Sequence, residues 1–370
     1  MTKTLKVAIV CDWLDGIGGA EQVVRAFHRQ YPDAPIYTST YRPQNIDWFS
    51  NADVRTGWLN IFPTKLRKFL SPLRYLYFDH LDLRQYDLIL SSSGAEAKGV
   101  KTRADATHIC YLHAPTQYYW QKYDDYLKNP GFGPLDPLAR LGLKLLVSPL
   151  RRIDYKFAQR PDHIITASSY VQGEIKKYYH RTSTIIFPPV NTEKFRCRSK
   201  NRNGFVTIGR QVPWKRVDLA IAACIKTKQQ LTVIGDGSEH EDLVRQAQAH
   251  QNLITFLPTT DSAGVRRALS QARGFIFPSL EPFGIAPVES LATGTPVIAY
   301  GAGGALDYII DGQNGILFPS QSVKSLSTAI KKFNQSTFDH RAITRSANKF
   351  SEKIFTTKTQ AFINHHLKTD

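Results

Sequence analysis

Two glutamates, Glu281 and Glu289, are separated by seven residues that include Pro287, a residue that suits the first turn of a helix. They follow an apolar, strand-like run at residues 274–277. If the stretch were helical, a rise of about 1.5 Å per residue would place the two carboxylates roughly 12 Å apart. Carboxylates that act together on one glycosidic bond lie about 5–9.5 Å apart. The spacing therefore favours two carboxylates that hold separate hydroxyl groups of one extended ligand.

Phe283 and Gly284 lie between these glutamates. Gly284 leaves room for backbone donors near the expected start of the helix, where negative charge is favoured. The alternative for this segment is one solvated glutamate at a helix start and another on the helix surface.

Arg210 and Lys215 directly follow another strand-like run, residues 204–208. A guanidinium group and a flexible ammonium group at the carboxyl end of a strand can bind a diphosphate. Without further context, two solvated surface cations explain the same residues.

Gly18 and Gly19 lie between a first strand-like run, residues 7–10, and an amphipathic stretch that continues to Phe27. Glycines at such a turn let backbone N–H groups approach an anion at the start of a helix. The dinucleotide-binding fingerprint would require a third glycine where Glu21 stands. A tight turn without a ligand is the alternative.

His113 follows the run of residues 107–111 and precedes the aromatic residues Tyr118, Tyr119 and Trp120. A single histidine is more often structural than catalytic. Its place at the end of a predicted strand nevertheless makes His113 a candidate.

Short apolar runs alternate with longer amphipathic stretches, which is typical of βα units around parallel sheets. The predicted strands cover residues 7–10, 87–90, 107–111, 163–166, 204–208, 231–234, 254–257, 274–277 and 296–299. The paired prolines Pro188 and Pro189 interrupt this pattern. We therefore expect two doubly wound α/β domains, residues 1–188 and 189–350. Ligands of such folds bind outside the carboxyl ends of the strands, so a cleft between the domains is the expected site.

The composition is that of a globular protein, with 42% hydrophobic residues and a formal net charge of +17 in 370 residues. The positive charge favours a polyanion, an anionic membrane surface or a diphosphate as partner. Cys11, Cys110, Cys197 and Cys224 lack zinc-site spacing, so we expect buried thiols and a reducing compartment. We expect neither an export signal nor a membrane span, which predicts a protein that is cytoplasmic or peripheral on a membrane.

Two segments are basic and amphipathic, with cations interleaved between apolar residues, which is typical of peripheral membrane binding. They cover residues 55–78 and 138–160. Helices that pack on the sheet and leave their cations in water are the alternative.

Taken together, the motifs resemble glycosyltransferase family 4, whose members have the GT-B fold of two Rossmann-like domains facing a central cleft. The resemblance rests on residues 18–21, His113, Arg210, Lys215 and the segment from Glu281 to Glu289, in this order. It extends over essentially the whole chain and includes a final helix near residues 351–366, within a segment 351–370 that in the family returns to the first domain. The segment 111–120 most resembles bacterial mannosyltransferases of surface polysaccharide assembly.

The resemblance implies how a nucleotide-sugar donor would be held. Arg210 and Lys215 would neutralise the departing diphosphate, and Glu289 would hold the ribose hydroxyls.

The sugar itself would be held by Glu281 and by the backbone at Phe283 and Gly284. His113 would contact the sugar near its reacting face, and the pair Gly18–Gly19 would let the first domain close on donor and acceptor.

The reaction implied by this family retains the anomeric configuration and needs no metal or other cofactor. The leaving phosphate would help to take the proton of the acceptor, and catalysis would rest on charge stabilisation and positioning. GDP-mannose is the expected donor, with a UDP-hexose or UDP-N-acetylhexosamine as the alternative. The expected acceptor is a lipid-linked or polysaccharide glycan of the cell surface.

Three other classes stay open at this point. An NAD-dependent oxidoreductase would share the architecture, but the missing third glycine and the glutamate pair count against it. A nucleic-acid-binding protein is suggested only by the charge, and we expect no nucleic-acid partner because no recognition motif is present. A non-catalytic sensor of sugar nucleotides is the third alternative.

Overall fold

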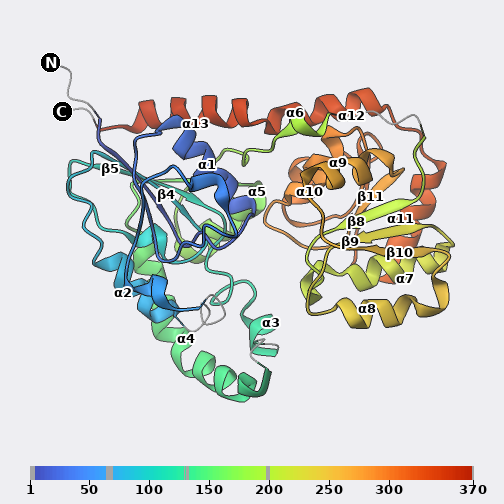
Figure 1. The fold of residues 1–370 in the computed structure, drawn as a ribbon, viewed down its shortest axis with the longest axis horizontal. Helices are drawn as coiled ribbons and strands as arrows, with labels where there is room; N and C mark the ends of the chain where they lie inside the picture. The colour runs from blue at the N-terminus through green and yellow to red at the C-terminus, as the bar shows by residue number, and fades with distance from the viewer. Residues whose placement is uncertain (1–4, 64–69, 129, 131–132, 197–200, 369–370) are drawn as a thin grey trace. The chain divides into compact units, whose positions relative to one another are not determined.

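The computed structural model describes residues 5–63, 70–128, 130, 133–196 and 201–368. The chain folds into two compact units, coloured along the sequence in Figure 1. Unit 1 consists of Met1–Pro189 together with Phe355–Asp370, and unit 2 consists of Val190–Ile354. The division falls between Pro189 and Val190, at the run of prolines that interrupts the strand pattern.

Unit 1 is built on a parallel sheet of seven strands in the order β3-β2-β1-β4-β5-β6-β7. The strands are β1 (Val7–Cys11), β2 (Ile36–Thr38), β3 (Val54–Thr56), β4 (Leu88–Ser93), β5 (Thr107–Leu112), β6 (His163–Thr166) and β7 (Thr184–Ile185). All residues of β1, β4 and β5 are buried, as expected for central strands covered on both faces.

Helices cover both faces of this sheet. They are α1 (Gly19–Gln30), α2 (Ser71–Asp79), α3 (Tyr123–Lys128), α4 (Asp136–Ala158), α5 (Ser169–Tyr179) and α13 (Glu352–His366), with single 3-10 turns that include η4 (Ala97–Gly99). Phe78 of α2 and Phe157 of α4 share one core with Val10 of β1. Phe355 of α13 packs between Phe27 of α1 and Tyr111 of β5, with ring centroids 5.8 and 5.9 Å apart. The final helix therefore belongs mostly to unit 1.

Unit 2 contains a parallel sheet of six strands in the order β10-β9-β8-β11-β12-β13. The strands are β8 (Phe205–Ile208), β9 (Leu231–Ile234), β10 (Ile254–Leu257), β11 (Gly274–Phe277), β12 (Val297–Tyr300) and β13 (Gly315–Phe318). This is the strand order of a dinucleotide-binding Rossmann fold, in which the order reverses between the first and fourth strands. That switch point lies between β8 and β11.

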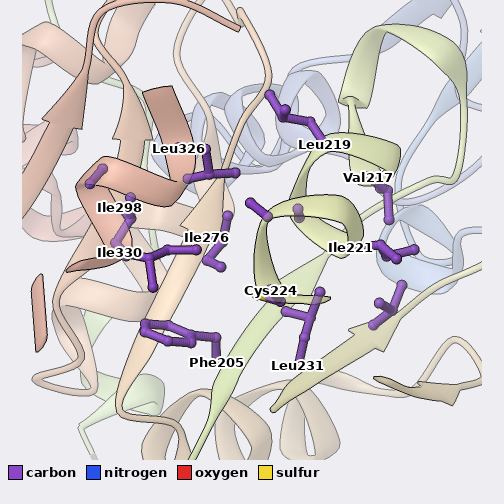
Figure 2. Packing of buried hydrophobic residues seen from close by; sticks show 14 of the residues in the cluster. Phe205, Val217, Leu219, Ile221, Cys224, Leu231, Ile276, Ile298, Leu326 and Ile330 are labelled. Atoms are coloured by element: carbon purple, nitrogen blue, oxygen red, sulfur yellow. The ribbon is translucent and has the colours of Figure 1, made fainter. Parts of the chain in front are cut away.

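The helices of unit 2 are α6 (Thr192–Phe195), α7 (Val217–Thr227), α8 (His240–Ala247), α9 (Ser262–Gln271), α10 (Ile285–Ala292), α11 (Val323–Gln335) and α12 (His340–Ser346). Figure 2 shows the core between the sheet and two of these helices, with Ile221 of α7 and Ile330 of α11 among the labelled side chains. The prediction of two doubly wound α/β units is confirmed.

Four short strands were absent from the sequence-based prediction: β2, β3, β7 and β13. The expected burial of the thiols is confirmed for Cys11, Cys110 and Cys224. Cys197 lies outside the described residues.

Candidate functional site

Strands β8 and β11 are neighbours at the switch point of unit 2, so the turns that follow them end at the same edge of the sheet. Lys215 ends the 3-10 turn η6 (Pro213–Lys215) after β8, and its ammonium group forms an ion pair with Oε1 of Glu281, which lies in the loop after β11. Ser279 Oγ donates a hydrogen bond to the same oxygen, at 2.9 Å. Two of the predicted residues are therefore in direct contact at the edge where such sheets bind ligands.

Gln211 fixes the turn that carries Arg210 and Lys215. Its side chain is completely buried, and its amide Nε2 donates to the carbonyl oxygen of Gly235 at 2.7 Å. Its Oε1 lies 2.7 Å from Nδ1 of His240. A Cβ atom on Gly237 would lie only 2.4 Å from the carbonyl oxygen of Gln211, so glycine is required there. Sequence reasoning did not single out Gln211, and the glycines after β9 are the signal that could have indicated a close backbone approach there.

Arg210 is exposed, and its side chain makes no hydrogen bond or ion pair among the described residues. Its guanidinium group can therefore bind an anion without first breaking a contact within the protein. Guanidinium groups bind phosphate through paired N–H donors, so this position suits a diphosphate.

Two close contacts hold the loop from Glu281 to Gly284. Tyr308 OH donates to the carbonyl oxygen of Phe283 at 2.7 Å, and the N–H of Gly304 donates to the carbonyl oxygen of Glu281 at 2.9 Å. Gly284 has a φ of 91°, and a Cβ atom there would lie 2.8 Å from Phe277 Cζ. Glycine is therefore required immediately before α10.

The ring of Phe283 is buried and contacts Tyr308 and Phe350, with centroid distances of 5.4 and 5.8 Å. Its side chain belongs to the core, so only the backbone at this position is available to a ligand. The N–H of Gly284 makes no hydrogen bond with another described residue. It adds to the free N–H groups that every helix presents in its first turn.

Glu289 lies on α10, and its carboxyl group makes no hydrogen bond or ion pair among the residues that the structure describes. Burial raises the pKa of Glu289 to about 7, and the charge of Lys194 offsets only part of that rise. This carboxyl group is half-buried, has no partner among the described residues and ionises near neutral pH. It is therefore a candidate for binding hydroxyl groups of a ligand.

His113 in unit 1 directly follows β5, and its Nε2 lies 2.8 Å from Ser92 Oγ on the neighbouring strand β4. Its ring centroid is 5.2 Å from that of Tyr111. Burial lowers the pKa of His113 to about 4, so the imidazole is neutral at physiological pH. It can then act as a hydrogen-bonding group but carries no charge.

Gly18 is the N-cap residue of α1, and Gly19 is the first residue of that helix. A Cβ atom on Gly18 would lie 2.8 Å from Oε2 of Glu21, which is buried on α1. A side chain at position 18 would therefore displace Glu21.

Asp12 follows β1, and sequence reasoning gave it no role in the site. Its carboxylate accepts the N–H groups of Gly94 and Ala97 at 2.7 Å, the N–H of Ala95 at 3.1 Å and the hydroxyl of Ser93 at 3.1 Å. Burial and the neighbouring carboxylate of Glu96 raise the pKa of Asp12, and the backbone donors partly offset the rise. Asp12 thus ties the loop after β1 to the loop after β4 at the switch point of unit 1.

A buried network around Asp154 of α4 holds the loop that follows His113. The Asp154 carboxylate accepts from Thr116 Oγ1 at 2.7 Å, from Trp120 Nε1 at 2.7 Å and from Lys98 Nζ at 2.6 Å. Burial alone would raise the pKa of Asp154, but Lys98 and the hydrogen bonds hold it below its ordinary value. Sequence reasoning missed this network because Thr116 and Asp154 are 38 positions apart.

A second buried ion pair joins Arg74 of α2 to Glu96, with Arg74 Nε 2.8 Å from Glu96 Oε2. Tyr118 OH donates to the same carboxylate at 2.9 Å. Arg74 was predicted to belong to a basic surface segment, and that prediction is wrong because the side chain is buried and paired.

Within the residues that the structure describes, no group of three or more histidine, cysteine, aspartate or glutamate side chains has the arrangement of a metal site. None of the described helices is long and apolar enough to cross a membrane.

Residues 189–350, almost all of unit 2, match the family described as glycosyl transferases group 1. The uncharacterized glycosyltransferase YqgM of Bacillus subtilis (strain 168) is 28% identical over 46% of this chain and 51% of its own length. The chain therefore matches about half the length of that relative. The alpha-1,3/1,6-mannosyltransferase ALG2 of Rhizomucor pusillus is 23% identical over 98% of this chain and 92% of its own.

Among solved structures, HepE of Anabaena in complex with UDP superposes with a TM-score of 0.70. It is 18% identical, and the superposition covers 97% of this chain and 100% of HepE. The same protein is also known in complex with UDP-glucose. The chain thus has the GT-B fold of two Rossmann-like units, and its residues 189–350 match the glycosyl transferases group 1 family.

Proposed function

We propose that this protein is a retaining glycosyltransferase that moves a hexose from a nucleotide sugar to a glycan acceptor without a metal ion. The observation that carries the proposal is the contact between Lys215 and Glu281 at the switch point of unit 2, where the turn after β8 also carries Arg210, whose side chain has no ion pair with a described residue. Lys215 and Arg210 supply cations for a diphosphate, and Glu281 supplies a carboxylate for sugar hydroxyls. These residues lie on loops that follow the adjacent strands β8 and β11. The match of residues 189–350 to group 1 glycosyl transferases supports this assignment.

In this proposal Lys215 changes partner when the donor binds. The ammonium group leaves Glu281 and, with Arg210, neutralises the charge that develops on the diphosphate as the bond to the sugar breaks. The released Glu281 carboxylate then accepts hydrogen bonds from sugar hydroxyls, with the Gly284 N–H nearby on the same loop. Cations placed in advance at a developing charge stabilise the transition state at little reorganisation cost.

Glu289 holds the ribose hydroxyls, and the neutral His113 hydrogen-bonds the sugar near the reacting carbon. The pair Gly18–Gly19 leaves the start of α1 open to donor and acceptor. The acceptor hydroxyl attacks on the face from which the diphosphate departs, through an oxocarbenium-like state, and the leaving phosphate oxygen takes the proton. The bond between the anomeric carbon and the phosphate oxygen breaks as the new glycosidic bond forms.

GDP-mannose is the proposed donor, and a lipid-linked or polysaccharide glycan on the cytoplasmic side of a membrane is the proposed acceptor. The full-length likeness to a mannosyltransferase supports mannose. A UDP-hexose is the second candidate, because HepE, with the same fold, was solved with UDP and with UDP-glucose.

The test is thermal stabilisation of the purified protein by GDP, UDP, ADP and NAD, with the corresponding sugar nucleotides measured alongside. A ligand that binds only the folded state raises the melting temperature. We expect a shift with GDP and GDP-mannose, and its loss in the Arg210→Ala and Lys215→Ala variants but not in the surface control Lys226→Ala.

A shift with UDP ligands alone would keep the enzyme class and replace the donor. A shift with NAD alone would overturn the transferase proposal in favour of an oxidoreductase. If the protein binds the donor but transfers sugar to no glycan acceptor, it is a non-catalytic sensor of sugar nucleotides instead.

A further inference from the structure

Helix α4 carries an apolar face that no part of the described structure covers. Of the large hydrophobic side chains that are exposed among the described residues, five lie on this helix: Leu138, Leu141, Leu145, Leu146 and Ile153. Leu138 and Leu145 are 67% and 68% exposed. Soluble proteins rarely leave such a continuous apolar row in water, and rows of this kind mark interaction sites.

The spacing of three of these residues places them on the side of α4 opposite the buried Val147 and Asp154. Leu138, Leu141 and Leu145 are separated by three and four positions and therefore share a face. Val147 and Phe157, which are buried, point toward the core of unit 1. Figure 1 shows the first half of α4 running out beyond the sheet of unit 1. Packing within unit 1 therefore does not account for the leucine face.

Cations flank the leucine face and continue its side of α4 toward the end of the helix. Lys144, Arg152 and Lys156 are exposed and make no ion pair among the described residues. The guanidinium group of Arg140 donates instead to the carbonyl oxygen of Lys128, and Arg151 donates to the carbonyl oxygen of Tyr119 at 2.6 Å. An apolar face bordered by unpaired cations matches the boundary between acyl chains and anionic headgroups.

We propose that α4 docks the protein on an anionic membrane, with Leu138, Leu141 and Leu145 inserted at the level of the acyl-chain boundary and Lys144, Arg152 and Lys156 against the headgroups. The net charge of +17 attracts the whole chain to such a surface. This inference goes beyond the proposed sugar transfer and does not depend on the donor.

The second basic segment, residues 55–78, contributes less to such a surface than its sequence indicates. Arg55 pairs with Asp53 at 2.7 Å, and Arg74 is buried against Glu96. The cations Lys65, Arg67 and Lys68 lie outside the described residues. The membrane surface is therefore assigned to α4.

The test is cosedimentation of the full chain, without nucleotide, with vesicles of phosphatidylcholine alone or of phosphatidylcholine and phosphatidylglycerol in equal parts. We expect binding to the mixed vesicles at low salt and its weakening at high salt. The Leu141→Ser/Leu145→Ser variant should partition at least about tenfold less, because it removes inserted apolar side chains. The Lys144→Glu/Arg152→Glu variant should lose about fivefold or more for each charge.

The matched control is Val244→Ser/Leu257→Ser, which changes two exposed apolar residues of unit 2 and should bind vesicles as the original protein does. Unchanged vesicle binding by Leu141→Ser/Leu145→Ser would overturn the proposal. So would a dimer in solution that becomes monomeric in this variant, because a second copy would then cover the face.

Melting curves with the sugar nucleotides separate this test from the proposed function. If the leucine variant is still stabilised by the donor, it is folded, and its loss of vesicle binding reports on the membrane surface alone. If no nucleotide stabilises any variant while vesicle binding follows the pattern above, the proposed transfer fails and the docking surface stands.

Discussion

Glu289 combines burial, the absence of a partner among the described residues and a pKa raised to about 7. Because the folded-state pKa lies above its ordinary value of 4.5, ionisation of Glu289 opposes folding. The free energy of unfolding therefore falls as the pH rises from about 4.5 through about 7, by a few kcal/mol at most, since each pKa unit corresponds to about 1.4 kcal/mol. Ionisable residues whose pKa is shifted at the expense of folding stability are frequent at ligand sites.

We predict that donor binding restores the charge on Glu289. Ribose hydroxyls that donate to the carboxylate favour its ionised form, so the bound pKa must lie below that of the free protein. The affinity for the sugar nucleotide, whose phosphates do not titrate near neutrality, should rise with pH up to about 7. Binding measured by calorimetry at several pH values checks this slope, which should vanish in Glu289→Gln. A slope of the same size in that variant would contradict the assignment.

At the scale of elements, the buried Asp154 of α4 accepts hydrogen bonds from the loop that follows β5 and so fixes its position. The same carboxylate pairs with Lys98, and both side chains are completely buried. A buried charge that loses its partner is expensive, since it keeps its desolvation cost without the compensating attraction. The network therefore positions the segment from His113 to Trp120 as well as stabilising unit 1.

We expect Asp154→Ala to destabilise unit 1 by about 3–5 kcal/mol, because Lys98 would remain buried and unpaired. The measurement is the midpoint of urea unfolding, followed by the fluorescence of tryptophans such as Trp120, which bonds Asp154 directly. Asp82→Asn is the matched control because the Asp82–Arg84 pair lies at the surface, and we expect little change there. If both variants shift the midpoint equally, the network contributes no special stability.

The same elements show how far the sequence alone could go. The central strands are continuous apolar runs, and each was predicted within a few residues because both faces of these strands are buried. Strands β2, β3 and β7 contain two or three residues, which is too short for a periodic signal, whereas β13 is as long as several strands that were predicted. Their pairing is set by the neighbouring strand rather than by their own composition.

At the candidate site, the sequence predicted which residues could bind a donor. It did not predict the contacts that position these residues. Lys215 and Glu281 are 66 positions apart in the sequence. Their contact could be predicted only with knowledge of the strand order in the sheet. Gln211 and Asp12 act through backbone groups of distant loops, and such partners leave no pattern near the residue itself. Arg74 was misjudged for the same reason, since its partner Glu96 lies on another element.

At the scale of the whole molecule, unit 1 is completed by a helix that comes after all of unit 2 in the sequence. Phe355 of α13 is 1% exposed and packs on Phe27 and Tyr111. Thr359 Oγ1 of the same helix donates to the side chain of Gln30 at 3.2 Å. Part of the core of unit 1 is therefore supplied from residues beyond position 354.

We expect Phe355→Ala to destabilise unit 1 by about 3–5 kcal/mol, the usual cost of removing a buried aromatic ring. The neighbouring Ile354→Ala, at a position 37% exposed, is the control and should change stability by no more than about 0.5 kcal/mol. Amide hydrogen exchange in the full chain can locate the effect, with faster exchange expected in β1 and β5 and unchanged exchange in β8 and β11. Faster exchange confined to unit 2 would contradict the packing.

The chain enters unit 2 at Val190 and leaves it at Ile354, and these two crossings lie close together because Val190 pairs with Ser351 and its N–H donates to the carbonyl oxygen of Phe350 at 2.9 Å. Unit 1, although residues up to Pro189 are made first, therefore lacks α13 until all of unit 2 has been synthesised. Unit 1 therefore cannot complete its fold before unit 2 has been made, in contrast to chains whose N-terminal domain is complete first. Nascent chains released before α13 should carry a folded unit 2 and a protease-sensitive unit 1.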